Sequence, residues 1–263
     1  MNERESFVAG SFYPGSKERL EEELELFFKN EEKKPETAVI VSPHAGYEYS
    51  GRVAAKAFAR LENQETTVIL GPNHTGMGLP VSVSNADQWK TPLGILKVDS
   101  EKREKLLEAL ETEADDEAHF QEHSIEVQLP FLRFLFGDKK ILPVCVMSHN
   151  LEGLVNLGNA LALLENVSVV VSSDFSHFLP LENAREKDLE AIEFIKNLDI
   201  AGFYREVNEK QLSICGSGPI IAGMQFALKK GYKSAELLEY NTSASVTKDE
   251  MNVVGYAAIA FKK

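Results

Sequence analysis

The sequence is most informative at Val169-Val170-Val171-Ser172-Ser173-Asp174-Phe175-Ser176-His177, where an apolar run changes within a few residues into a polar segment. The run is typical of a buried strand. Asp174 and His177 follow where that strand should end. In open α/β sheets, ligands and catalytic groups gather at the carboxyl ends of the strands. We therefore predict a functional site at the end of this strand.

Four further segments repeat this pattern, each an apolar run that stops at a motif with a reactive side chain. They are residues 38–41 before Ser42-Pro43-His44, 67–70 before Gly71-Pro72-Asn73-His74, 141–147 before Ser148-His149, and 211–214 before Cys215-Gly216. We expect these strand ends to share one pocket. His149 has less sequence context than the others, and we interpret it as a structural residue.

Helical patterns alternate with these strands. The spacing of apolar residues predicts helices over 20–28, 53–61, 101–111, 119–136, 151–164, 182–197 and 219–230, and strands over 236–241 and 253–261. Ser16 is a suitable N-cap for the first helix, and Pro130 should interrupt the fourth. The helix over 53–61 should join two parallel, paired strands in a βαβ unit. The order predicts an α/β fold, with one domain over 1–263 and a central, mostly parallel or mixed sheet flanked by helices.

The bulk composition excludes several classes of protein. A formal charge of −13 argues against a nucleic-acid partner, because neutralising phosphates needs clustered Lys and Arg. No apolar stretch approaches the length of a membrane span, and residues 1–5 lack the features of a signal peptide. The two cysteines are far apart in sequence, which argues against a disulfide framework. We expect a reduced, cytoplasmic protein without membrane or nucleic-acid partners.

Three residues are candidate metal ligands. His44 and His74 each follow a predicted strand, after a turn that contains proline, and two such imidazoles are well placed to share one ion. Cys215 precedes a Gly-rich segment and the predicted helix near Pro219, and a helix N-terminus favours the thiolate that binds metals. Cys145 lies inside an apolar run, so we predict that it is a buried core residue.

Three other residues are candidates for catalysis. If Asp174 and His177 share one face of a helical turn, the carboxylate can orient the imidazole, and His177 is the better candidate for general acid and base. Asp174 can equally be a helix N-cap. His123 and Glu126 should share a helical face with His119, which either lines the pocket or is a polar helix surface.

Taken together, the motifs resemble one known family. They are Phe12-Tyr13-Pro14, Ser42-Pro43-His44-Ala45-Gly46-Tyr47, Gly71-Pro72-Asn73-His74, Glu122-His123-Ser124, Ser173-Asp174-Phe175-Ser176-His177 and Cys215-Gly216. From near residue 7 to the C-terminus, their kind and order resemble the Memo family, whose eukaryotic namesake is a mediator of receptor-driven cell motility.

The resemblance implies a relationship to class III (LigB-type) extradiol dioxygenases, with a similar α/β fold. Those enzymes hold Fe(II) with two His and one carboxylate, and use a further His as acid and base. By resemblance, His44 and His74 are the two ligands and His177 is the acid/base residue, while Cys215 takes the carboxylate position. A thiolate is softer than a carboxylate, which favours iron or copper redox chemistry, or zinc, and argues against ring cleavage.

Two classes of function therefore remain open. The first is a metal-dependent oxidoreductase that holds non-haem Fe(II) or Cu at His44, His74 and Cys215, a metal that purified protein can lack. Zinc, as in a hydrolase, is a weaker third option. The second is a non-enzymatic binding or adaptor protein that uses the same cleft for a peptide or a small molecule. The resemblance also implies a functional link to radical-SAM and AMMECR-type proteins.

Overall fold

Buried aliphatic residues form the middle of one mixed sheet. The computed structural model of the protein describes residues 2–263. Its strands are β1 (Glu3–Arg4), β2 (Val39–Ser42), β3 (Thr66–Pro72), β4 (Val81–Val83), β5 (Gln88–Thr91), β6 (Gly94–Val98), β7 (Lys140–Val146), β8 (Val167–Ser172), β9 (His177–Leu179), β10 (Ser234–Thr242) and β11 (Val253–Lys262). The main path through the sheet is β1-β5-β6-β7-β3-β8-β2-β11-β10, with β4 on β7 and β9 on β11.

The parallel centre of the sheet is β6-β7-β3-β8-β2. Every residue of β2, β3 and β8 is buried, as expected for parallel strands with both faces covered. The edges are antiparallel at β5-β6 and at β2-β11-β10. The structure confirms the predicted α/β class and its mixed sheet.

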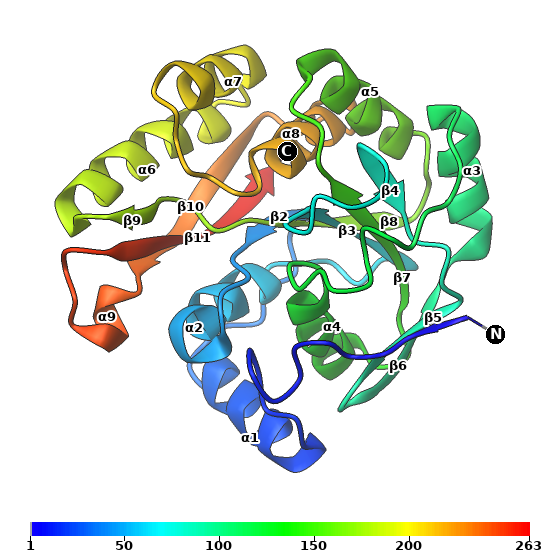
Figure 1. The fold of residues 1–263 in the computed structure, drawn as a ribbon, viewed down its shortest axis with the longest axis horizontal. Coiled ribbons are helices and arrows are strands. Elements are labelled where there is room, and N and C mark those ends of the chain that lie inside the picture. Colours follow the sequence, from blue (N-terminus) through cyan, green and yellow to red (C-terminus); the bar gives the residue numbers. More distant parts are fainter. Residues whose placement is uncertain (1) are drawn as a thin grey trace.

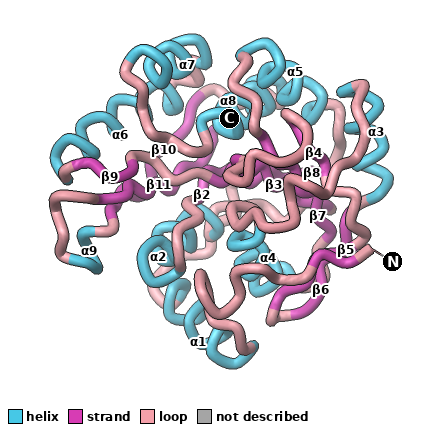
Figure 2. The backbone as a smooth tube through the Cα atoms, viewed as in Figure 1, coloured by secondary structure: helices cyan, strands magenta, loops and turns pink. Residues whose placement is uncertain are grey.

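Helices cover both faces of this sheet (Figure 1). They are α1 (Lys17–Phe28), α2 (Tyr47–Phe58), α3 (Ser100–Leu110), α4 (Leu129–Phe136), α5 (Leu151–Ala162), α6 (Leu181–Lys196), α7 (Ile200–Glu209), α8 (Ser217–Lys229) and α9 (Ala244–Thr247), with a 3₁₀ turn, η1, over Glu126–Gln128. Helices α1, α2 and α4 lie on one face, and α5, α6, α7 and α8 on the other (Figure 2). No helix among residues 2–263 combines the length and the apolar character needed to cross a membrane.

Three local predictions were wrong. Strand β8 lies between β2 and β3, so the strands joined by α2 are parallel but are not neighbours. Residues 211–214 form a turn and a loop rather than a strand. Helix α4 begins at Leu129, with Pro130 in its first turn, because proline is tolerated where no helical N–H partner is needed. The segment 119–125 before it contains no helix.

Candidate metal centre

The two candidate histidines lie on either side of the end of β8. His44 follows the last residue of β2 by two positions, and His74 follows the last residue of β3 by two. Their ring centroids are 5.3 Å apart, at an interplanar angle of 75°. Because β8 separates β2 from β3, both imidazoles reach over the carboxyl end of the intervening strand. The strand-end prediction therefore places these two residues correctly.

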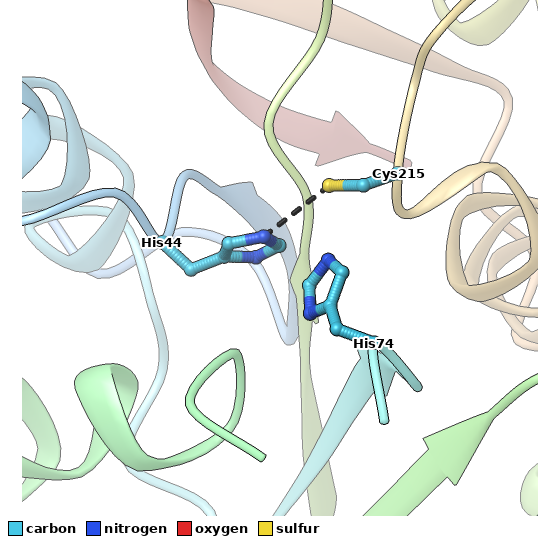
Figure 3. A group of neighbouring side chains, drawn as sticks. All are labelled: His44, His74 and Cys215. Atoms are coloured by element: carbon cyan, nitrogen blue, oxygen red, sulfur yellow. Dashed lines mark hydrogen bonds between the residues drawn. The ribbon is translucent and has the colours of Figure 1, made fainter. Parts of the chain in front are cut away.

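Cys215 approaches the pair from the opposite face of the sheet, at the start of α8. Its Sγ atom is 3.2 Å from His44 Nε2, and Figure 3 shows the three side chains converging. One ligand atom from each of His44, His74 and Cys215 lies within 4.8 Å of the others. Gly216 makes this approach possible, because a Cβ atom there would lie only 2.4 Å from Ser173 Cβ.

Hydrogen bonds determine which nitrogen of His44 faces the centre. The hydroxyl of Ser172 donates its one proton to the carbonyl of Ser124 at 2.6 Å, so it must accept from its other partners. These are Gln128 Nε2 at 2.8 Å and His44 Nδ1 at 2.9 Å. His44 therefore carries its proton on Nδ1, and the lone pair of Nε2 points toward Cys215.

A buried carboxylate determines which ring nitrogen of His74 carries the proton. Glu122 Oε1 lies 2.9 Å from His74 Nδ1, and Glu122 Oε2 accepts from the backbone N–H of His74 at 2.6 Å. Burial alone would raise the pKa of Glu122, but the hydrogen bond and charge of His74 and the N–H of Ser124 lower it to about 2. A charged Glu122 fixes the His74 proton on Nδ1, which leaves Nε2 free as a ligand.

The candidate ligands differ in their protonation states. Burial lowers the pKa of His44 well below its usual value, and the neighbouring His123 and His74 lower it further, so His44 is neutral as a ligand must be. Burial, followed by the charge of Asp174, raises the pKa of the Cys215 thiol, so without a metal the start of α8 does not favour the predicted thiolate. Without a metal, the thiol keeps its proton and can donate it to the Nε2 lone pair of His44, and a bound ion would displace that proton. Two imidazole nitrogens and one sulfur thus form a set that fits a transition metal.

His123 belongs to the centre, although its predicted helix is absent. Its ring stacks on His74 at 4.7 Å with an interplanar angle of 17°, and lies 5.4 Å from the ring of His44. Its predicted companions on that face are elsewhere. Glu126 binds the N-terminal segment, and His119 packs against Trp89. His123, His74 and Glu122 form a second group with metal-ligand spacing, in which Glu122 already binds His74.

Asp174 and His177 lie at the site but not on one helical turn. The residues between β8 and β9 are not helical, so that prediction was wrong. Asp174 Oδ1 instead accepts from the backbone N–H of His44 at 2.8 Å, and burial raises its pKa to about 6. His177 Nδ1 lies 2.8 Å from the carbonyl oxygen of Ser213 and must donate to it, which leaves Nε2 as a proton acceptor. His177 is therefore oriented by Ser213 rather than by Asp174.

Sequence reasoning missed the residues that hold the imidazoles. Ser172, Gln128 and Glu122 are all fully buried polar residues. Glu122 stands in one of the quoted motifs, but nothing in the sequence indicates that it serves His74. The prediction for the other cysteine is confirmed, because Cys145 is buried in β7. His149, which was interpreted as structural, is exposed and lies outside the group.

These features define a class of protein: an α/β fold with a His/His/Cys group, suited to holding a metal, at the carboxyl end of its parallel strands. The chain belongs to the Memo-like protein family, whose model matches residues 4–260. It is 46% identical to a MEMO1 family protein of Methanosarcina barkeri, over 97% of this chain and 98% of that protein. It is 39% identical to a MEMO1 family protein of Aquifex aeolicus, over 99% and 100%.

A solved structure supports the fold. The crystal structure of an uncharacterized protein from Escherichia coli K12 matches 84% of this chain and 98% of its own, with a TM-score of 0.55. The sequence identity is 14%, so this likeness concerns the architecture alone.

Proposed function

We propose that this protein binds a redox-active metal, Fe(II) or copper, through His44, His74 and Cys215. One observation carries the proposal: three ligand atoms lie within 4.8 Å of one another, and hydrogen bonds at Nδ1 leave both imidazole Nε2 atoms free. Such second contacts are what orient metal-binding imidazoles in known sites. A soft thiolate beside two imidazoles suits copper and iron, with zinc as a further candidate.

When bound, the metal would supply redox or Lewis-acid chemistry. The chain's own residues would orient the reactants and move protons. His177 is half-buried, and its Nε2 lone pair makes it the candidate general base. Asp174 holds the backbone of His44, and His123 supports the ring of His74 by stacking. On this basis we propose a metal-dependent oxidoreductase.

A second function is favoured by the apolar side chains next to the centre. Met77 and Phe120 are 55% and 72% exposed, and large exposed apolar groups often mark a binding surface. A non-enzymatic protein would use the cleft beside these side chains to bind a peptide or a small molecule, and it would need no metal. The two functions therefore differ in their requirement for the ion.

Metal content tests the first proposal. Protein purified without oxygen is analysed by mass spectrometry for iron, copper and zinc, beside Cys215→Ser, His74→Ala and His149→Ala variants. We expect stoichiometric iron or copper in the wild-type protein and in the exposed control His149→Ala, and loss of metal in the other two. Wild-type protein that contains no metal and takes up none of the added Fe(II), Cu(I) or Zn(II) would overturn the proposal and favour the binding protein.

Spectroscopy shows whether the sulfur is a ligand. Cu(II) added to the wild-type protein should produce a thiolate-to-copper charge-transfer band. The band should be absent in Cys215→Ser and present in Cys145→Ser, because Cys145 is buried in β7, outside the His/His/Cys group. A band of equal strength in Cys215→Ser would exclude Cys215 as a ligand.

A further inference from the structure

A cleft that the metal centre does not use lies beside His74. It consists of two cavities, an inner one of about 310 Å³ and an outer one of about 590 Å³. Both are lined by Asp116 and Phe120, so the two cavities adjoin. The outer cavity includes Thr75, which follows His74, and Gln121, which precedes Glu122. The cleft therefore opens next to the segments that carry the centre.

The walls of the cleft are apolar at three exposed positions. Phe7 lines the inner cavity, Met77 the outer cavity, and Phe120 both. These side chains are 53%, 55% and 72% exposed. The cavities have volumes typical of small-molecule sites, and these three large apolar side chains favour a ligand with an apolar body.

The charges around the cleft are negative. Its lining contains the carboxylates of Glu3, Asp116 and Glu117, together with that of Glu5, which is already paired with Lys90 at 3.1 Å. Among the described lining residues, Arg4 has the one cationic side chain, and it is buried in an ion pair with Glu126 and so is already neutralised. An anionic ligand would be repelled here, whereas a cation would be attracted.

His119 lines the inner cavity and contains a buried hydrogen-bond acceptor. The side chain is 1% exposed and lines that cavity. Its Nε2 atom lies 3.0 Å from the carbonyl oxygen of Ser82, so Nε2 must carry the proton and donate it. Nδ1 therefore holds a lone pair, and it has no hydrogen-bond partner among the described residues. Buried polar atoms in native proteins nearly always have a partner.

We propose that this cleft binds a small organic ammonium compound with an aromatic or aliphatic body. An N–H group of the ligand donates to His119 Nδ1, and the carboxylates around the cleft balance its charge. The apolar body lies against Phe120 and Met77, where the face of the Phe120 ring can also attract the cation. The site is independent of the proposed metal centre and gives the second proposed function a chemical class of ligand. Its position beside His74 also makes such a compound a candidate substrate for the metal centre.

Four matched probes test the charge and the hydrogen bond separately. They are 2-phenylethylammonium, its N,N,N-trimethyl analogue, 2-phenylethanol and phenylacetate, each titrated into the full chain and followed by the backbone amide NMR signals of residues 75–77 and 116–121. We expect the primary ammonium to bind about tenfold more tightly than the alcohol, and phenylacetate to bind most weakly. The trimethyl analogue keeps the charge but has no N–H, so it should bind more weakly than the primary ammonium.

Variants locate the interaction. Phe120→Ala should weaken binding of the primary ammonium about tenfold. Leu163→Ala should not change it, because Leu163 is an equally exposed apolar residue that lies directly after α5, outside the cleft. Glu117→Gln should weaken binding of the two cations and leave binding of 2-phenylethanol unchanged. His119→Phe should abolish the difference between the primary ammonium and its trimethyl analogue. If that variant does not fold, the comparison of the two cations on the wild-type protein still tests the hydrogen bond.

Two results would overturn the proposal: equal or tighter binding of phenylacetate, or amide shifts that lie outside the cleft. The same titration with metal-free and iron-loaded protein separates this site from the proposed function. Protein that takes up no metal but selects the ammonium would refute the metal centre and support the cleft. Protein that binds iron but shows no preference for the ammonium would refute the cleft alone.

Discussion

At the scale of single residues, Glu122 is the group on which the orientation of His74 depends. Both of its oxygens contact that histidine, one at Nδ1 and one at the backbone N–H. Glu122→Gln removes the charge that holds the proton on Nδ1, so metal affinity should fall by about 10- to 100-fold. Competition with a chelator of known affinity measures the change.

Glu117→Gln is the matched control for this variant, because Glu117 is a nearby exposed glutamate without contact to an imidazole. Its metal affinity should equal that of the wild-type protein. An unchanged affinity in Glu122→Gln would mean that His74 is oriented by the stacked ring of His123 instead.

The ligands themselves could be predicted from the sequence, whereas their supporting residues could not. His44 and His74 stand directly after apolar runs, and the strand-end rule brings such residues together without further information. Glu122 is 48 residues away from His74 in the chain, and Ser172 is 128 from His44. Which buried polar group meets which imidazole depends on the packing of loops, for which the sequence contains no periodic signal.

At the scale of elements, the start of α8 brings Cys215 to the end of β8. Gly216 lies so close to that strand that an added Cβ atom would be 2.6 Å from the carbonyl oxygen of Ser172 and 2.4 Å from Ser173 Cβ. Gly216→Ala must therefore push the helix start away. We expect a loss of about 1–3 kcal/mol in the free energy of unfolding, together with weaker metal binding, measured by urea titration and by chelator competition.

Gly153→Ala in α5 is the matched control, because the nearest atoms to an added Cβ there are 3.8 Å away. It should leave metal binding unchanged and stabilise the protein slightly, since alanine favours helix more than glycine does. Equal metal affinities in Gly216→Ala and in the wild-type protein would show that the position of Cys215 does not depend on this contact.

The elements also show why part of the fold could not be predicted from the sequence. Helix periodicity and buried strand runs are local signals, and they located most helices and the strands β2, β3, β7 and β8. The position of β8 between β2 and β3 is a long-range property, which those signals do not contain. Residues 211–214 were predicted as a strand because they were interpreted as an apolar run, yet the apolar residues Leu212 and Ile214 are buried from a loop.

At the scale of the whole molecule, the buried carboxylate of Glu126 joins the N-terminal segment to the core. Glu126 pairs with Arg4 and also accepts from the backbone N–H of Phe7 and Val8 and from the hydroxyl of Tyr13. Arg4→Met leaves a buried carboxylate without its cation, which should cost about 3–5 kcal/mol in the free energy of unfolding. Urea denaturation measures this loss.

The double variant Arg4→Met with Glu126→Gln tests the cause. The amide that replaces the Glu126 carboxylate in the double variant carries no charge and needs no cation. The double variant should therefore lose less free energy of unfolding than the two single variants lose together. Additive losses would show that Arg4 stabilises the fold through its packing on Trp89 rather than through its charge.

The response of the whole fold to acid should depend on His119. Burial lowers the pKa of His119 to about 4, against about 6.5 in the unfolded chain. Between these values the unfolded chain binds more protons than the native protein, so stability falls as the pH drops from 6.5 toward 4. At pH 5, the lowered pKa of His119 should reduce the free energy of unfolding by about 2 kcal/mol. Glu122 does not contribute to this loss, because its pKa is about 2 and its stabilising effect is lost only below about pH 4.5.

The comparison that isolates His119 uses metal-free protein and its His119→Phe variant, unfolded in urea at pH 7 and at pH 5. His44 and His123 also have lowered pKa values, so both proteins should lose stability over this interval. The variant should lose about 2 kcal/mol less than the wild-type protein, because it has no imidazole to protonate at residue 119. Equal losses would mean that His119 can take up a proton in the native fold, and its Nδ1 atom would then be a donor rather than the free acceptor on which ammonium binding in the cleft depends.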